Sequence, residues 1–289
     1  MNEQFAQFLR RGEQAGARYA LAAPRQRALG SAGVQLGARS GSSLEFREHR
    51  DYQPGDDLRR IDWNAYARTD RLTLKLYREE INPHCDLVLD GSRSMNLGES
   101  AKAEAALGLT ALLAVAAANA GFTHNVWLAS DRCLPLTNGT ARPTAWAAPE
   151  FNFAGHPAES FTRTPPRWRR QGVRLLISDL LWLGEPAQLL QPLAHEAAHT
   201  IVIQLLAAQD AAPTVRGRLR LIDAESGEPR EIFVDDAALA RYQSALSRHQ
   251  QLWQQACRQA GATFVELIAE QVVADWNLSP LVAAGVLVV

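Results

Sequence analysis

Apolar and polar positions change in a regular order along the larger, carboxyl-terminal part of the chain. Short runs rich in Val, Ile and Leu alternate with longer stretches in which apolar residues recur at helical spacing. The short runs predict strands over 85–89, 125–129, 173–178, 200–206 and 263–267. The longer stretches predict helices over 100–119, 185–198 and 236–260. This alternation favours an α/β fold of the doubly wound type, with a mostly parallel sheet covered by helices on both faces.

Shorter features flank this core. Residues 2–20 carry apolar side chains near helical spacing and predict an amphipathic helix, and the Gly- and Ser-rich stretch 30–43 predicts a loop. Alternation over 72–77 predicts a half-buried strand, and 219–222 with 231–234 predict a hairpin. We expect an amino-terminal helix and β/loop extension over 1–81 and an α/β domain over 82–289, with the hairpin inserted near 217–234.

The composition fits a protein with a large core in a reducing compartment. Of 289 residues, 47% are hydrophobic, and the formal net charge of −1 provides no general attraction to nucleic acid or anionic lipid. The cysteines at 85, 133 and 257 lack the spacing of disulfide or zinc sites. The apolar stretch 105–118 is shorter than the roughly 20 residues that span a bilayer. We expect a cytoplasmic protein with no membrane insertion and no nucleic-acid partner.

A polar loop follows the first strand of the alternating region. The apolar run 87–89 ends at Asp90, and Ser92 and Ser94 follow at alternate positions. Ligands of open α/β sheets bind at the carboxyl ends of the strands. Carboxylate and hydroxyl oxygens suit Mg²⁺, and also Mn²⁺, better than they suit a thiolate-seeking metal. The loop therefore predicts a magnesium site.

A second aspartate, Asp179, ends the predicted strand 173–178. If the two strands are neighbours, the carboxylates of Asp90 and Asp179 lie about 6 Å apart and repel each other by about 3 kcal/mol at an effective dielectric constant of about 20. A divalent cation between them would remove this repulsion. One open coordination position could then accept an acidic residue of a protein partner.

The D-x-S-x-S pattern, with an aspartate after a later strand, resembles the metal-ion-dependent adhesion site (MIDAS) of the von Willebrand factor A domain. In that family a Thr from a second loop joins the two. The resemblance covers about residues 82–270 and implies the metal ligands Asp90, Ser92, Ser94, Thr140 and Asp179, with Thr137 as an equal alternative to Thr140.

The segment before the first strand carries a second pattern, with Glu45-Phe46-Arg47, Pro54-Gly55-Asp56-Asp57, Ile61-Asp62-Trp63 and Ala67-Arg68. It closely resembles the hallmark of a bacterial family called domain of unknown function fifty-eight. That resemblance implies a von Willebrand A-like domain after a short amino-terminal segment, and an association with MoxR-type AAA+ ATPases. It favours a metal-dependent adaptor, acting with such an ATPase to remodel or assemble another complex, over an enzyme.

Plainer interpretations stand beside these. Asp90 and the two serines could cap the following helix. The charged residues of 44–80 could form a network that fixes this segment, in which Trp63 and Tyr66 would be packing residues. A metal-free scaffold that makes its contacts through 44–80 is therefore the main alternative function.

Two motifs leave a metal-dependent hydrolase as a further alternative. Residues 195–199 satisfy H-E-x-x-H, in which two histidines hold zinc, but the strand predicted from Thr200 leaves His199 at a helix end. Asp90 as a phosphoryl-accepting nucleophile would need an aspartate two residues later, where Ser92 stands. The sequence contains no P-loop and no G-x-S-x-G motif. We expect no catalytic residues.

Overall fold

The computed structural model describes residues 3–22, 44–53, 56–79, 83–97, 100–224 and 226–289. The chain forms two units, one of residues 1–25 and 83–289 and the other of residues 26–82. The first helix, α1 (Glu3–Gly16), packs in the large unit.

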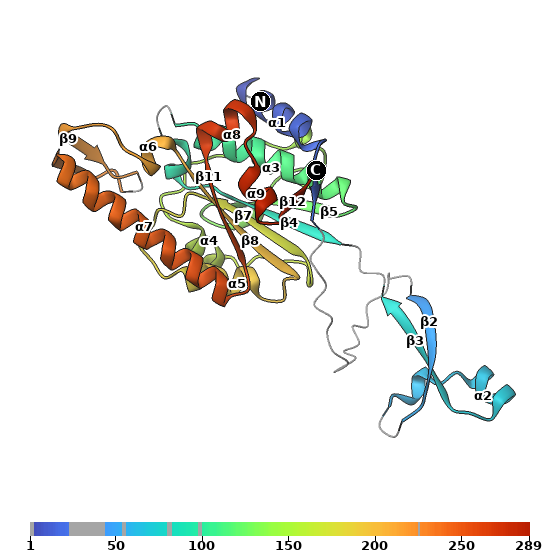
Figure 1. Cartoon of the computed structure of the whole chain (residues 1–289). Coiled ribbons are helices and arrows are strands. Elements are labelled where there is room, and N and C mark those ends of the chain that lie inside the picture. The colour runs from blue at the N-terminus through green and yellow to red at the C-terminus, as the bar shows by residue number, and fades with distance from the viewer. Residues whose placement is uncertain (1–2, 23–43, 54–55, 80–82, 98–99, 225) are drawn as a thin grey trace. The chain divides into compact units, whose positions relative to one another are not determined.

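A six-stranded sheet lies at the centre of the large unit (Figure 1). Its order is β11-β8-β7-β4-β5-β6, and every neighbouring pair is parallel except β5 and β6. The strands are β4 (His84–Asp90), β5 (Thr123–Ala129), β6 (Cys133–Pro135), β7 (Val173–Ser178), β8 (His199–Leu206) and β11 (Thr263–Ile268). The predicted strands and the mostly parallel α/β sheet are confirmed.

Helices cover both faces of this sheet (Figure 1). One face packs against α3 (Lys102–Asn119) and α8 (Ala269–Asp275), and α1 packs on α3. The other packs against α4 (Pro157–Arg163), α5 (Pro186–Ala194) and α7 (Asp236–Gln259). On β4, Leu87 and Leu89 point to the first core and Val88 to the second. A strand buried on both faces favours apolar residues, which explains the run 87–89 before Asp90.

The central helix α3 owes its pattern to burial on nearly all sides. Thirteen of its residues are buried, and the chain leaves the helix through Gly121 at φ +78°, a conformation that favours glycine. Among the described residues, α3 alone is long and apolar enough to cross a membrane, but 72% of it is buried inside the unit. We interpret it as a core helix.

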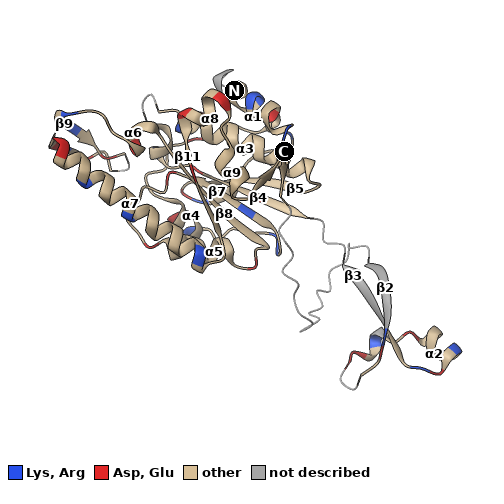
Figure 2. Cartoon of the chain, viewed as in Figure 1, with Lys and Arg blue, Asp and Glu red and all other residues tan. Residues whose placement is uncertain are grey.

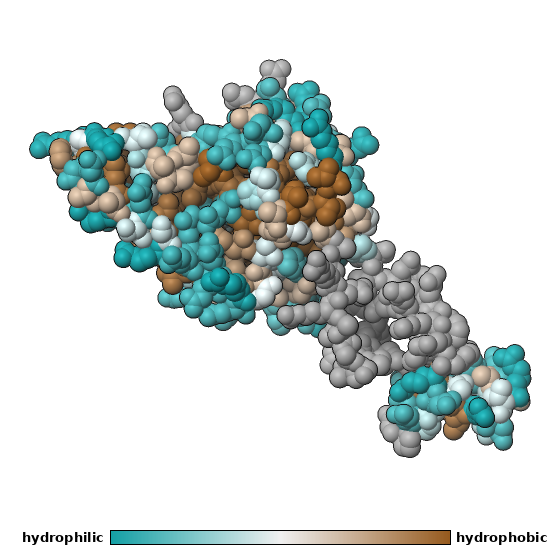
Figure 3. Space-filling view, in the orientation of Figure 1, coloured by the Kyte–Doolittle hydropathy of each residue, from teal (hydrophilic) through white to brown (hydrophobic). Residues whose placement is uncertain are grey.

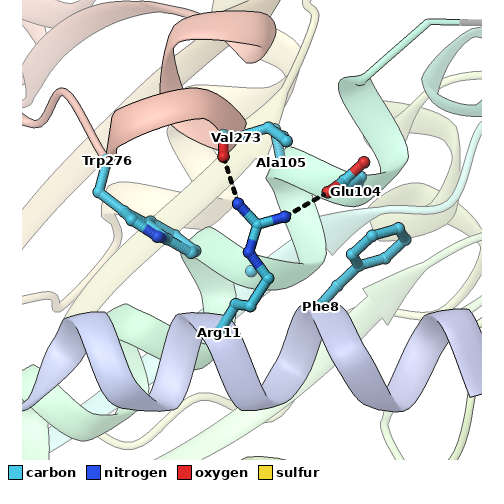
Figure 4. Close-up of a pocket in the computed structure, with 7 residues that line it drawn as sticks. Phe8, Arg11, Glu104, Ala105, Val273 and Trp276 are labelled. Carbon is cyan, nitrogen blue, oxygen red and sulfur yellow. Dashed lines mark hydrogen bonds and ion pairs between the residues drawn. The ribbon is translucent and has the colours of Figure 1, made fainter.

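Helix α1 approaches α3 closely because glycines face each other. A Cβ built on Gly12 would lie 2.1 Å from the carbonyl oxygen of Gly108. Beside this contact, Arg11 reaches from α1 to the other helices: its Nη1 is 3.1 Å from Glu104 Oε1 of α3, and its Nη2 donates to the carbonyl of Val273 in α8 (Figure 4). These contacts place α1 in the core of the large unit.

The large unit also contains a set of shorter elements. They are β1 (Ala20–Leu21), η2 (Arg93–Asn96), η3 (Pro143–Ala145), α6 (Ala208–Ala211), β9 (Gly217–Ile222), β10 (Pro229–Val234), α9 (Ser279–Ala283) and β12 (Leu287–Val288). Strands β9 and β10 form the predicted hairpin, and β1 pairs with β12. Acidic and basic residues are interspersed over the unit (Figure 2), and an apolar area lies near α9 and β12 (Figure 3). Val282 of α9 and Val288 of β12 are exposed.

The small unit consists of β2 (Leu44–Asp51) paired antiparallel with β3 (Thr73–Glu79), and of η1 (Leu58–Arg60) and α2 (Trp63–Thr69). The buried Asp62 caps α2 by accepting the N–H groups of Asn64 and Ala65 at 3.0 and 3.1 Å. Asp56 accepts Arg50 Nη2 at 2.7 Å. Acidic residues of the hallmark therefore organise the segment, as the plainer interpretation expects.

Trp63 and Tyr66 do not pack inside this unit, contrary to our expectation. They are 60% and 37% exposed and contact each other edge to face, because both lie on the outer side of the short helix α2. The loop predicted over 30–43 and the Pro54-Gly55 turn fall outside the described residues.

Candidate functional site

The polar loop after β4 lies at the centre of the carboxyl edge of the sheet. Asp90 is 1% exposed, and both its carboxylate oxygens accept hydrogen bonds. Oδ1 accepts the Ser92 N–H at 2.9 Å, and Oδ2 accepts the hydroxyl of Ser178 at 2.6 Å. Ser178 is the last residue of β7, so the neighbouring strand helps to position this carboxylate.

The two serine hydroxyls of the loop have a spacing that suits a metal ion. Ser92 Oγ and Ser94 Oγ are 3.0 Å apart. In an octahedral Mg²⁺ site with bonds of about 2.1 Å, oxygens at neighbouring positions are about 3.0 Å apart. The two hydroxyls are hydrogen-bonded to each other at this distance, which is also the separation that two ligands of one Mg²⁺ ion would have.

The sheet brings Asp179 beside this loop, as the sequence predicts. Leu89 lies opposite Ile177, so the residues that end β4 and β7 emerge side by side. Asp179 is 2% exposed, and its Oδ1 accepts the Leu181 N–H at 3.1 Å. Gln204 Nε2 of β8 donates to the Asp179 carbonyl at 3.0 Å. Three neighbouring strands therefore fix the position of Asp179.

Negative charge is concentrated at this edge. Burial, and then the nearby charge of Asp179, raise the pKa of Asp90 from 3.8 to about 7, although hydrogen bonds from Ser178 and Ser92 act in the opposite direction. A buried carboxyl beside a like charge gains stability from any cation that approaches it. This edge of the sheet is therefore a favourable place for a positive ion.

One cation at this edge belongs to the chain itself. Lys102, at the beginning of α3, has a side chain only 3% exposed. Its Nζ lies 2.9 Å from Asp179 Oδ2 and 3.0 Å from Asp210 Oδ2. Burial acts to lower the pKa of Lys102, but Asp179 and Asp210 together raise it above its ordinary value, so the ammonium stays charged. The sequence analysis missed Lys102 because one lysine at a helix entrance has no distinctive pattern.

Thr140 and Thr137 are not at this site, and the prediction of a second-loop ligand among them is wrong. β6 runs antiparallel to β5 and carries the chain away from the carboxyl edge. The Val126 N–H donates to Gly139, and His124 Nε2 contacts the Ala141 carbonyl. Val126 pairs with Leu87, three residues before Asp90, and His124 pairs with Cys85, five residues before it, so Thr140 lies about 10–16 Å along the strands from the site.

A different segment lies where a second loop was expected. Phe153 forms a parallel bridge with Ser92, donates its N–H to the Gly91 carbonyl at 3.1 Å and accepts the Arg93 N–H at 2.9 Å. The neighbouring residues are Asn152 and Ala154, so this segment provides backbone support and no threonine hydroxyl. The Pro-rich sequence around it has no periodicity from which its position could be predicted.

The donor set fits a divalent ion at the first loop. Two hydroxyls at 3.0 Å stand beside a buried carboxyl whose pKa is raised. The described residues contain no group of three or more His, Cys, Asp and Glu side chains arranged to hold a metal. Any ion at this edge would therefore depend on hydroxyl ligands, which is the arrangement that D-x-S-x-S predicts.

The H-E-x-x-H motif does not form a zinc site on one helix. Helix α5 ends at Ala194, four residues earlier than predicted, and His195 is its C-cap. Glu196 has φ +57°, and His199 begins β8, where its Nε2 contacts Thr263 Oγ1 at 3.0 Å. The turn at Glu196 separates the two histidines that a zinc protease would hold on one helical face.

Comparisons with known proteins identify relatives whose function is also open. Residues 48–252 match the family described as "Protein of unknown function DUF58". The uncharacterized proteins Mb1516 of Mycobacterium bovis and Rv1480 of Mycobacterium tuberculosis are each 29% identical over 84% of this chain and 80% of their own length.

Two solved structures from Bacteroides also resemble parts of the chain. The conserved hypothetical protein BatB from Bacteroides thetaiotaomicron is 10% identical, with a TM-score of 0.35 over 66% of this chain and 95% of that protein. An aerotolerance-related membrane protein from Bacteroides fragilis is 13% identical, with a TM-score of 0.38 over 68% of this chain and 98% of that protein. Likenesses at these scores carry no argument about this chain.

Proposed function

The chain belongs to the DUF58 family of proteins of unknown function, and we propose that it is a non-enzymatic adaptor that binds a protein partner through a Mg²⁺-dependent site. The observation that carries this proposal is the pair of hydroxyls on Ser92 and Ser94, 3.0 Å apart beside the buried Asp90. In this proposal the large unit is a von Willebrand factor A-like domain, and its first loop is the core of a MIDAS.

Asp90, Ser92 and Ser94 would hold the ion, and Mn²⁺ could replace Mg²⁺ there. A bound divalent cation supplies positive charge and an open coordination position for a carboxylate from the partner. The chain's own residues orient the site: Ser178 fixes Asp90, and Phe153 fixes the backbone on both sides of Ser92. Asp179 adds negative charge beside Asp90.

Exposed apolar side chains near the ligand loops support a protein partner. Leu181 and Leu183 follow Asp179 and are 39% and 101% exposed, and Leu97, which follows the first loop, is 44% exposed. Leucines exposed around a charged centre are typical of a surface that a partner covers. The partner would therefore offer an acidic residue surrounded by apolar ones.

The resemblance of the hallmark segment to its family favours a MoxR-type AAA+ ATPase as this partner, with the pair remodelling or assembling another complex. A cytoplasmic location is consistent with the three free and buried cysteines. We include neither nucleic acid nor membrane insertion in the proposal.

Affinity capture with the full chain tests the proposal. Capture of the ATPase in Mg²⁺ should be lost in EDTA and with Ser92→Ala/Ser94→Ala, which removes two hydroxyls and no charge. Thr140→Ala is the matched control, because it removes a hydroxyl about 10–16 Å away along the strands. Equal capture by the double variant and by wild type, with or without EDTA, would contradict a metal-dependent adaptor.

A metal-free scaffold is the second candidate, and the exposure of Trp63 and Tyr66 favours it. The edge-to-face pair and the 59% exposed Leu58 give the small unit an apolar surface of its own. A scaffold that binds through this surface would lose its partner with Trp63→Ala and keep it in EDTA. The adaptor would show the opposite response.

A further inference from the structure

Lys102 connects three elements at the carboxyl edge of the sheet. It begins α3, Asp179 follows β7, and Asp210 lies in α6, after β8. Its ammonium is within 3.0 Å of a carboxylate oxygen from each of the two acids. The side chain of Asp210 is itself held, because Oδ2 accepts the Ala207 N–H at 3.2 Å. Asp179 and Asp210 therefore form a site for a positive charge, and the ammonium of Lys102 fills it.

The Lys102 ammonium occupies the side of Asp179 that a metal ion would need in order to use this carboxylate as a ligand. Asp179 Oδ2 accepts from Lys102, and Oδ1 accepts the Leu181 N–H. A divalent ion bound to this carboxylate would lie close to a buried positive charge, and the two cations would repel each other strongly at low dielectric constant. An ion can therefore take Asp179 as a ligand only if Lys102 releases it.

Asp90 differs from Asp179 in this respect. Its two oxygens accept hydrogen bonds from a backbone N–H and from a hydroxyl, which are neutral donors. No ammonium of the chain is paired with Asp90 in these contacts, whereas Asp179 is already paired with that of Lys102.

We propose that Lys102 is a tethered cation that takes the place of a metal ion at Asp179, so that the first loop alone holds the divalent ion and holds it weakly. The part of this inference that concerns the first loop rests on the proposed function. The part that concerns Lys102 does not, because it follows from the contacts of Lys102 with Asp179 and Asp210. A corollary is that removing the ammonium frees both carboxylates for a divalent ion.

The test compares wild type with Lys102→Met in the full chain, using Mn²⁺ affinity by calorimetry and thermal stability with and without Mg²⁺. Lys102→Met should bind Mn²⁺ at least about tenfold more tightly, a change of about 1.4 kcal/mol. It should melt at a lower temperature than wild type without ions, and Mg²⁺ should raise its melting temperature more than that of wild type. Lys102→Arg retains the charge and should behave as wild type does.

Each outcome has a distinct meaning. Mn²⁺ binding by wild type that is no tighter in Lys102→Met would overturn the role of Lys102 and leave the proposed function standing. No binding by wild type, together with tight binding by Lys102→Met, would overturn the proposed first-loop ion and support the tethered cation.

A double variant covers the case in which Lys102→Met does not fold in the absence of ions. Lys102→Met/Asp179→Asn removes both charges of the pair, so it should fold and show no enhanced response to Mg²⁺. Folding of Lys102→Met only in Mg²⁺ would support the inference. Failure of Lys102→Met to fold even in Mg²⁺, while the double variant folds, would contradict it.

Discussion

Replacing Asp90 with asparagine should make the protein more stable at neutral and alkaline pH. Asp90 is buried beside Asp179, and these two causes raise its pKa from 3.8 to about 7. Asparagine has nearly the same shape and carries no charge. Its amide oxygen can accept the Ser92 N–H, and its amide nitrogen can donate to Ser178 Oγ, so both hydrogen-bond partners are retained.

The sign and the size of the effect follow from linkage. Between pH 3.8 and about 7 the folded protein keeps the Asp90 proton that the unfolded chain releases, so the free energy of unfolding falls as the pH rises through this window. A separation of about three pH units between the two titrations corresponds to at most about 4 kcal/mol. Above about pH 7 this loss is complete, and below pH 4 it is absent.

Urea denaturation at pH 4, 5, 6, 7 and 8 measures this free energy directly. Asp90→Asn should match wild type at the acid end and exceed it by up to about 4 kcal/mol at pH 8. Asp51→Asn is the control, because it makes the same replacement at an exposed position. Mg²⁺ should raise the stability of wild type at pH 8 and not that of Asp90→Asn, since a bound ion stabilises only the protein that binds it.

Parallel pH profiles for wild type and Asp90→Asn would refute this reasoning. They would mean that Asp90 titrates alike in the folded and unfolded protein, so the loop would not concentrate negative charge. If the two profiles differ but neither changes in Mg²⁺, the raised pKa of Asp90 would be supported and the binding of a divalent ion at this loop would be contradicted.

Three further predictions concern the packing of α1, the buried Arg174 and the position of Thr140. Gly12→Leu should lower the free energy of unfolding by about 3 kcal/mol, because its Cβ would collide with the Gly108 carbonyl; an unchanged urea midpoint would contradict this packing. Arg174→Met should cost about 3 kcal/mol in the same assay, because Arg174 is 2% exposed and donates to the carbonyls of Leu193 and His195. Thr140→Ala should leave Mn²⁺ affinity unchanged by calorimetry, and weaker binding would show that our placement of the second loop is wrong.

The sheet could be predicted because its strands obey a simple physical rule. A parallel strand covered on both faces is rich in apolar side chains, so β4, β7 and β8 contain the apolar runs 87–89, 175–177 and 201–203, although Asp86, Arg174 and Gln204 are also buried in these strands. The points where these runs end are also visible, which is why Asp90 and Asp179 could be placed at one edge. The hairpin and α7 were predictable from their alternating and helical periods.

The rest of the site depends on contacts between distant segments, which local patterns do not encode. Thr140 was expected near Asp90 because of its sequence position, but the reversal at β6 places it toward the other end of the strands. Phe153 reaches the first loop through backbone hydrogen bonds, to which any residue could contribute. Lys102 is separated from Asp179 by 77 positions, and only the folded chain shows that they pair.

Anomalous diffraction from crystals of the full chain soaked in Mn²⁺ tests the central claim most directly. The account predicts a manganese peak within bonding distance of both Ser92 Oγ and Ser94 Oγ, on the Asp90 side of the site, with Lys102 still paired to Asp179. A peak that contacts neither hydroxyl, or a manganese ion bound to Asp179 in place of the Lys102 ammonium, would contradict it.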